Sequence, residues 1–299
     1  MHGGGSTGTA AAQHAGKLKW ALGLTGTYMF AEIAGGVVTG SLALLADAAH
    51  MMTDVGGLAL ALLAIRFAAR EATPQRTYGY LRMEVLSALT NAVVLLLVTV
   101  YILYEAYQRF LAPPEVLSGP MLIVASIGLF VNLVSMRLLA RGSSESLNIK
   151  GAYFEVLSDM LGSIGVIVAA LLIMWKGWAL ADPIIGAGIG LFIVPRTWSL
   201  LKKVTHILME GTPANVDLGI LERKLMEIAG VTAVHDLHVW TVTSGFDAMS
   251  GHIVVADISR GRDALLEARR IMKAEFGIDH VTIQIEDESS RAAEAVLHV

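Results

Sequence analysis

The chain has 299 residues, of which 55% are hydrophobic and only 16% are charged, and its mean hydropathy is +0.61. A soluble domain of this length carries about a quarter charged residues, so the composition argues against a soluble protein and indicates a polytopic membrane protein. There is no cysteine, which excludes disulfides and thiolate metal sites. The acidic excess lies after residue 210, where eight Lys or Arg accompany 14 Asp or Glu.

The first elements in chain order are a short tail and six apolar segments. Residues 1–16 contain no apolar core, so they predict a disordered tail rather than a cleavable signal peptide. Each of the six segments is long enough to cross about 30 Å of hydrocarbon as a helix. They cover residues 20–39, 41–66, 84–108, 119–139, 151–176 and 181–202. The sequence therefore predicts an α-helical polytopic membrane protein with a six-helix transmembrane domain over residues 17–210.

Basic residues around these segments predict the orientation. If the N-terminus is cytoplasmic, twelve Lys or Arg residues flank the segments on that side, Arg196 among them. Only Arg109 and Lys176 lie on the far side. Because cytoplasmic loops carry the excess of Lys and Arg, we expect a multi-pass protein in the lipid bilayer with both termini in the cytoplasm.

Residues 211–299 have the pattern of a small α+β domain. Leucines recur at helical spacing over residues 216–230, and the run ends at Gly230, which is suited to a C-cap. The elements after it are strands at 231–245 and 248–258, a helix at 262–277 and a strand at 280–286. This αββαβ order is typical of two-layer modules. No phosphate-binding loop occurs, so neither nucleotide nor nucleic acid is an expected partner.

Three ionisable residues interrupt the second apolar segment. The spacing from Asp47 to His50 is i, i+3 and that from His50 to Asp54 is i, i+4, so all three share one helix face. A carboxylate at the centre of a spanning helix costs roughly 2.5–3.5 kcal/mol on insertion scales, which excludes a lipid-facing position. His50 and Asp54 are therefore expected to approach a common point inside the bundle.

The fifth segment repeats this pattern with Glu155 and Asp159, followed by small residues that permit close helix packing. Together the two helices offer one imidazole and three carboxylates, a set that suits Zn²⁺ or Co²⁺ and allows Cd²⁺. The sequence thus predicts a divalent metal site of His50, Asp54, Glu155 and Asp159, with a structural hydrogen-bond cluster as the alternative. For Asp47, a gate or proton path and a helix-packing hydrogen bond both stay open.

At these residues the sequence resembles the cation diffusion facilitator family, and within it the bacterial cobalt-zinc-cadmium resistance exporters. The resemblance rests on four stretches in the family's order: GSLALLADAAHMMTDVGG, RTYGYLRMEVLSALTNA, SLNIKGAYFEVLSDMLGSIGVI and VHDLHVWTVTSG. It implies a homodimeric metal/proton antiporter of the bacterial inner membrane. It also implies a four-ligand site between the second and fifth helices and a ferredoxin-like cytoplasmic domain over residues 211–299.

The resemblance assigns roles to individual positions. His50, Asp54, Glu155 and Asp159 match the family's transport site. Zinc-selective members commonly have His where this chain has Glu155, so a range covering Zn²⁺, Co²⁺ and Cd²⁺ is expected.

Two further sets match family positions in or near the cytoplasmic domain. His235, His252 and Glu286 match positions where that domain binds metal, with ordinary strand histidines as the alternative. Arg82 and Glu210 match a charge interlock of a bacterial relative, with two unrelated interfacial charges as the alternative.

The expected function follows from the ligand chemistry. Histidine exchanges protons near neutral pH, and one nitrogen of His50 can bind either a proton or a metal ion. We expect metal export by alternating access with protons as the counter-ion, and metal as cargo and possible regulatory ion rather than cofactor. No enzyme activity is expected, because there is no HExxH motif and no general base beyond the ligands. A metal-sensing or structural membrane protein without transport is the alternative.

Overall fold

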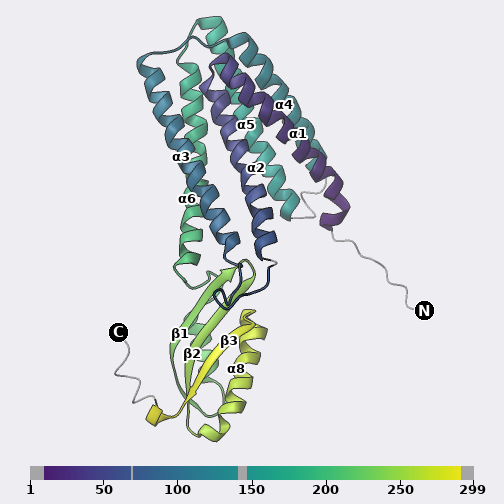
Figure 1. Ribbon diagram of the computed structural model, residues 1–299. Coiled ribbons are helices and arrows are strands. Elements are labelled where there is room, and N and C mark those ends of the chain that lie inside the picture. The colour runs from purple at the N-terminus through teal and green to yellow at the C-terminus, as the bar shows by residue number, and fades with distance from the viewer. Residues whose placement is uncertain (1–9, 69, 141–146, 291–299) are drawn as a thin grey trace, which may run out of the picture. The chain divides into compact units, whose positions relative to one another are not determined.

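The computed structural model describes residues 10–68, 70–140 and 147–290 (Figure 1). Its first part consists of six long helices. They are α1 (Ala10–Thr39), α2 (Leu42–Ala68), α3 (Met83–Leu111), α4 (Ser118–Ala140), α5 (Leu147–Lys176) and α6 (Ala181–Leu208). The chain divides into two compact units, one of residues 1–59 and 90–199 and the other of residues 60–89 and 200–299.

Helices are present at all six predicted positions. By length and composition, α3, α4, residues 152–176 of α5, and α6 qualify as membrane spans within the described chain. The start of α1 differs from the prediction, since residues 10–16 are helical rather than part of the tail. Ala10, Ala11 and Ala12 explain this, because alanine has the highest helix propensity. Residues 1–9 of the predicted tail lie outside the described residues.

The buried carboxylate of Asp182 connects α6 to the start of α2 in the first unit. The turn after α1 is tight because Gly40 adopts a left-handed conformation, with φ of 71°. Asp182, in the first turn of α6, then accepts hydrogen bonds from the Leu42 and Ala43 amides at 2.7 and 3.1 Å and from Ser41 Oγ at 2.6 Å. These bonds satisfy orphan amides at the start of α2 and tie α6 to it.

The second unit contains the C-terminal domain. Its elements are α7 (Leu218–Met226), β1 (Val231–Thr243), β2 (Phe246–Val255), a 3₁₀ turn η1 (Ile258–Arg260), α8 (Gly261–Phe276) and β3 (His280–Glu286). The sheet has the order β1-β2-β3, with β1 antiparallel and β3 parallel to β2. The predicted αββαβ order is therefore confirmed. Residues 291–299 of the predicted domain lie outside the described residues.

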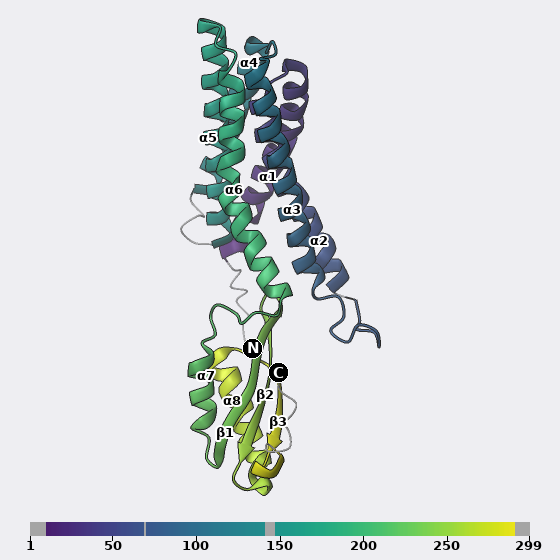
Figure 2. The same ribbon diagram turned by 90° about the vertical axis from the view of Figure 1, so that its left-hand side faces the viewer.

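Both domain helices cover the same face of this sheet (Figure 2). Leu221 and Leu225 of α7 and Met272 of α8 are fully buried against Met249 and Ile253 of β2. α7 begins at its N-cap Asp217, whose carboxylate accepts from the Ile220 amide. Its C-cap is Glu227 and not the predicted glycine; the left-handed Gly230 instead makes the turn into β1.

Candidate metal centre

The first cluster of metal-ligating side chains lies between α2 and α5. His50 and Asp54 are one turn apart on α2, and Glu155 is on α5. One ligand atom from each of the three lies within 4.8 Å of the others. His50 Nε2 is 3.6 Å from Asp54 Oδ2 and 3.7 Å from Glu155 Oε1. The helical spacing therefore brings donors from both helices to one point, with the imidazole buried.

Asp159 is more loosely associated with this cluster. Its Oδ1 lies 4.0 Å from His50 Nε2, and within the described chain it does not join the group whose ligand atoms all lie within 4.8 Å. Asp159 is buried, yet this oxygen has no hydrogen-bond partner among the described residues. A buried acceptor without a partner costs free energy, and a cation at the cluster would satisfy it.

The donor geometry is close to that of a bound divalent ion. A tetrahedral Zn²⁺ with bonds of about 2.0–2.2 Å to nitrogen and oxygen separates its ligand atoms by roughly 3.3–3.6 Å. The distances from His50 Nε2 to the three carboxylates are 3.6, 3.7 and 4.0 Å. The distances from His50 to Asp54 and Glu155 are close to this range, whereas Asp159, outside the group within 4.8 Å, would have to move further to join the coordination shell.

Arg196, counted above among the basic residues that flank the spans, reaches the same cluster. Its Nη1 donates a hydrogen bond to Glu155 Oε1 at 2.7 Å. α6 continues to Leu208, which leaves about three helical turns after Arg196.

Asp47 lies beside the cluster. It is buried, and its carboxylate packs against Gly162 of α5, where a Cβ would clash with it. Its Oδ2 has no hydrogen-bond partner among the described residues. The close approach fits helix packing and the unpartnered oxygen fits a proton path, so the role of Asp47 stays a prediction.

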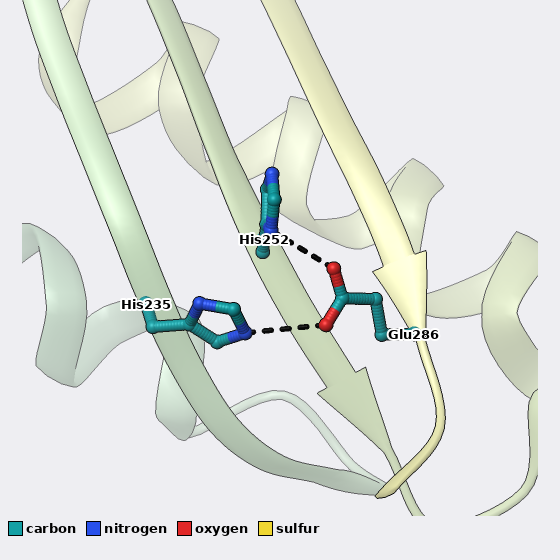
Figure 3. Close-up of side chains that lie close together, drawn as sticks. All are labelled: His235, His252 and Glu286. Atoms are coloured by element: carbon teal, nitrogen blue, oxygen red, sulfur yellow. Dashed lines mark hydrogen bonds and ion pairs between the residues drawn. The ribbon is translucent and has the colours of Figure 1, made fainter. Parts of the chain in front are cut away.

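A second cluster lies on the sheet of the C-terminal domain (Figure 3). His235 of β1 and His252 of β2 are register partners, and Glu286 ends β3. The Glu286 carboxylate lies between the two imidazoles, with Oε2 3.2 Å from His235 Nε2 and Oε1 2.8 Å from His252 Nδ1. Ligand atoms of all three lie within 4.8 Å of one another. Two imidazoles and a buried carboxylate form a donor set that fits Zn²⁺.

Known proteins share both parts of this architecture. Residues 18–209 match the cation efflux transmembrane domain. The chain belongs to the cation efflux family. Residues 213–288 match the cytoplasmic domain of cation efflux proteins. With its long apolar helices, this cation efflux protein is a multi-pass membrane protein.

Several cation efflux relatives match nearly the whole chain. The metal cation efflux system protein CzcD of Cupriavidus metallidurans is 49% identical over 94% of this chain and 89% of its own length. The cadmium, cobalt and zinc/H(+)-K(+) antiporter of Bacillus subtilis is 42% identical over 90% and 88%. The zinc transporter ZitB of Escherichia coli is 42% identical over 91% and 88%. A solved metal-bound C-terminal domain of the CzcD transporter is 37% identical over 24% of this chain and 99% of its own, with a TM-score of 0.22.

In the second unit of this cation efflux protein, polar contacts join residues at the helix ends to one another and to the C-terminal domain. Arg82 Nη2 donates to Glu210 Oε1 at 2.8 Å, so the predicted pair is in contact. Glu84, in the first turn of α3, accepts from Thr243 Oγ1 at 2.6 Å and Ser244 Oγ at 2.7 Å at the tip of the β1–β2 hairpin. The sequence did not single out Glu84, since an acidic first turn alone indicates only a helix start.

Proposed function

We propose that the protein exports Zn²⁺ from the cytoplasm in exchange for protons, with Co²⁺ and Cd²⁺ as further cargo. The observation that carries this proposal is the convergence of His50, Asp54 and Glu155 inside α2 and α5. Carboxylates held this close in a low dielectric repel one another, and a divalent cation or protons relieve the repulsion. The relatives described above, which include proteins named for cation efflux and zinc transport, support the same function.

The mechanism uses competition at His50. Neutral His50 and the ionised Asp54, Glu155 and Asp159 take up the metal while the cluster is open to the cytoplasm. After the helices reorient, a proton from outside binds His50 Nε2. The metal ion then leaves, because this nitrogen cannot bind a proton and a metal ion at the same time. Loss of the proton on the cytoplasmic side restores the cluster. Neighbouring carboxylates can share the proton, so several groups titrate together.

The cargo range follows from Glu155. A carboxylate at this position makes the ligand set richer in oxygen than one with two histidines, and it can bind through one or two oxygens. We therefore propose that the site accepts Zn²⁺, Co²⁺ and Cd²⁺. The Bacillus subtilis relative named for cadmium, cobalt and zinc supports this range.

The proposal includes location and assembly. Without Arg196, eleven basic residues still flank the spans on one side against two on the other, which supports cytoplasmic termini in a bacterial inner membrane. We propose a homodimer whose cytoplasmic domains cover residues 211–299. In each domain His235, His252 and Glu286 would hold a regulatory metal ion.

The test is Zn²⁺ flux in reconstituted vesicles against an imposed pH gradient. We expect wild-type protein to move Zn²⁺ in proportion to the gradient. Asp54→Ala and Asp159→Ala should reduce flux to that of protein-free vesicles, because each removes a charged ligand. Glu115→Ala, which changes an exposed carboxylate between α3 and α4, is the matched control and should transport normally.

Two outcomes would contradict this function. Wild-type flux that ignores the pH gradient would remove the proton from the mechanism. An absence of flux with Zn²⁺, Co²⁺ and Cd²⁺ alike would instead favour a metal sensor or structural membrane protein.

A further inference from the structure

Arg196 carries a permanent positive charge within α6, several turns from either end of the helix. An arginine in the middle of a membrane-spanning helix is costly unless it is paired or faces water, and the Arg196 side chain is 64% exposed in the single chain. Among the described residues, the hydrogen-bond acceptor of its guanidinium is Glu155, a residue of the transport site proposed above. The pair joins α5 to α6 and places a cation beside the cluster before any metal ion binds.

The hydrogen bond from Arg196 goes to the Glu155 oxygen that faces His50, where a metal ion would bind. Glu155 Oε1 accepts from Arg196 Nη1 at 2.7 Å, and the same Oε1 lies 3.7 Å from His50 Nε2. An ionised carboxylate has about four lone-pair sites on its two oxygens. The guanidinium occupies one of those on the oxygen that faces the position where a metal ion would bind.

The charges of the cluster agree with this arrangement. Three ionised carboxylates and a neutral imidazole give the four-residue site a charge of −3, because a metal-binding histidine is neutral. Arg196 reduces the total to −2, which balances one divalent cation. Without the guanidinium, the occupied site would keep one uncompensated negative charge in a low dielectric and would hold the cation more tightly.

We propose that Arg196 is a resident counter-cation that competes with the cargo for Glu155, and thereby lowers metal affinity and speeds metal release. The inference rests on the proposed transport function and adds a residue to it. When metal binds, Glu155 Oε1 turns from the guanidinium to the metal. When metal leaves, the guanidinium takes the carboxylate back, so the vacated site is not left with three facing negative charges.

The test is equilibrium binding of Co²⁺ to the full chain in detergent, followed by the d–d absorption of the bound ion. All proteins carry Glu286→Gln, so that the cytoplasmic cluster contributes little signal. The variants are Arg196→Gln, Arg196→Met and Arg196→Lys, and elution as folded protein is checked for each. Arg137→Gln, which changes an exposed arginine of α4, is the matched control.

We expect Arg196→Gln and Arg196→Met to lower the Kd for Co²⁺ by about tenfold or more, since a neighbouring positive charge is removed. Arg196→Lys, which keeps the charge, should stay within about threefold of the parent. The effect of Arg196→Gln should disappear when Glu155→Gln is also present, because the competition needs that carboxylate. In vesicles, Arg196→Gln should lower the maximal Zn²⁺ flux while the Zn²⁺ concentration at half-maximal flux also falls.

An unchanged or raised Kd in both neutral variants would overturn the inference and leave Arg196 as an orienting or structural residue. Tightening by Arg196→Lys as large as that by Arg196→Gln would overturn the charge argument. A Co²⁺ signal in the parent that survives Asp54→Ala would overturn the proposed transport site itself. That last result is distinguishable because it does not depend on any Arg196 variant.

Discussion

Asp182 shows how a single buried charge is stabilised in the first unit. Its carboxylate is fully buried and accepts from two amides and one hydroxyl at the start of α2. Arg109 Nη1 lies 3.4 Å from Asp182 Oδ2 and also donates to the Gly40 carbonyl at 2.5 Å. Arg109 is one of the two basic residues predicted on the far side, and Asp182 and the Gly40 carbonyl are among its acceptors.

Replacing Asp182 by Asn is expected to destabilise the protein by about 2 kcal/mol, because hydrogen bonds to a charged acceptor are worth about 1.5–3 kcal/mol. The amide also donates where the carboxylate accepts, so it would face the Leu42 or Ala43 N–H with its own NH₂ group. Arg109 would in addition lose a buried counter-charge. The measurement is the thermal unfolding midpoint in detergent.

The control for this prediction is Glu105→Gln. Glu105 also pairs with Arg109, at 3.0 Å, but its side chain is 30% exposed. Such partly solvated ion pairs contribute about 1 kcal/mol or less. Equal shifts in the two variants would contradict the assignment of Asp182 as the cap of α2.

Residue spacing predicted which side chains could meet but not which pairs form across the fold. The i, i+4 pairs on α2 and α5 were visible because both ligands of a pair lie on one helix. Arg196 and Glu155 are 41 residues apart, and Asp182 and Ser41 are 141 apart. A single sequence has no local signal for such pairs. The metal-binding role of the clustered residues stays a prediction that flux and binding measurements decide.

At the scale of elements, the approach of α2 to α5 depends on Gly162. A Cβ at this position would clash with the Asp47 carboxylate, so only glycine allows the present helix separation. The two helices carry all four proposed ligands. Their spacing therefore sets how closely His50 and Glu155 approach one another.

Gly162→Ala is expected to lower stability by about 1–3 kcal/mol, because overpacking costs more than the gain in helix propensity of about 1 kcal/mol. It should also weaken Co²⁺ binding, since the helices must separate. Thermal unfolding and Co²⁺ titration of the same preparation measure both effects.

Gly188→Ala is the matched control, because a Cβ at this helical position of α6 meets nothing within 4 Å. There the helix propensity of alanine acts alone, so stability should stay the same or rise slightly. If both variants lost stability equally, the contact with Asp47 would not be the cause.

Element types were predictable from periodicity, whereas element ends depended on local chemistry. The buried residues of α8, Ala264, Ala268, Ile271 and Met272, follow the helical repeat expected from the sequence. Strand β1 contains an irregularity between His235 and His238, where Asp236 has φ of 51°. Alternation of apolar residues does not reveal such a bulge, because the extra residue belongs to neither face.

At the scale of the whole molecule, the regulatory role proposed for the cytoplasmic cluster requires that metal binding there influences transport at the His50 cluster. Within the second unit, Glu84 provides a direct contact between the first turn of α3 and the β1–β2 hairpin. Its carboxylate accepts hydrogen bonds from the hydroxyl groups of Thr243 and Ser244. Arg82, two residues before Glu84, pairs with Glu210. Strand β1, which ends at Thr243, also carries His235 of the cytoplasmic cluster.

Glu84→Ala is expected to reduce Zn²⁺ flux by about fivefold or more, because typical coupling free energies of 1–3 kcal/mol correspond to about 5–150-fold. The Kd of the transmembrane cluster should stay unchanged within about twofold. The variant removes the acceptor of both hydroxyls but no proposed ligand. Glu286→Ala should reduce flux by a similar factor, because it removes a proposed ligand of the regulatory metal, whose binding would act through β1. Flux in vesicles and Co²⁺ titration are measured for each protein.

The double variant Glu84→Ala with Glu286→Ala decides whether the two residues act in one path. If the contact of Glu84 with the hairpin transmits the effect of metal binding at the cytoplasmic cluster, either substitution alone removes that effect. The Zn²⁺ flux of the double variant should then equal that of each single variant. Reductions that multiply would show two independent effects. Glu71→Ala, an exposed carboxylate of the connection between α2 and α3, is the control and should leave flux unchanged.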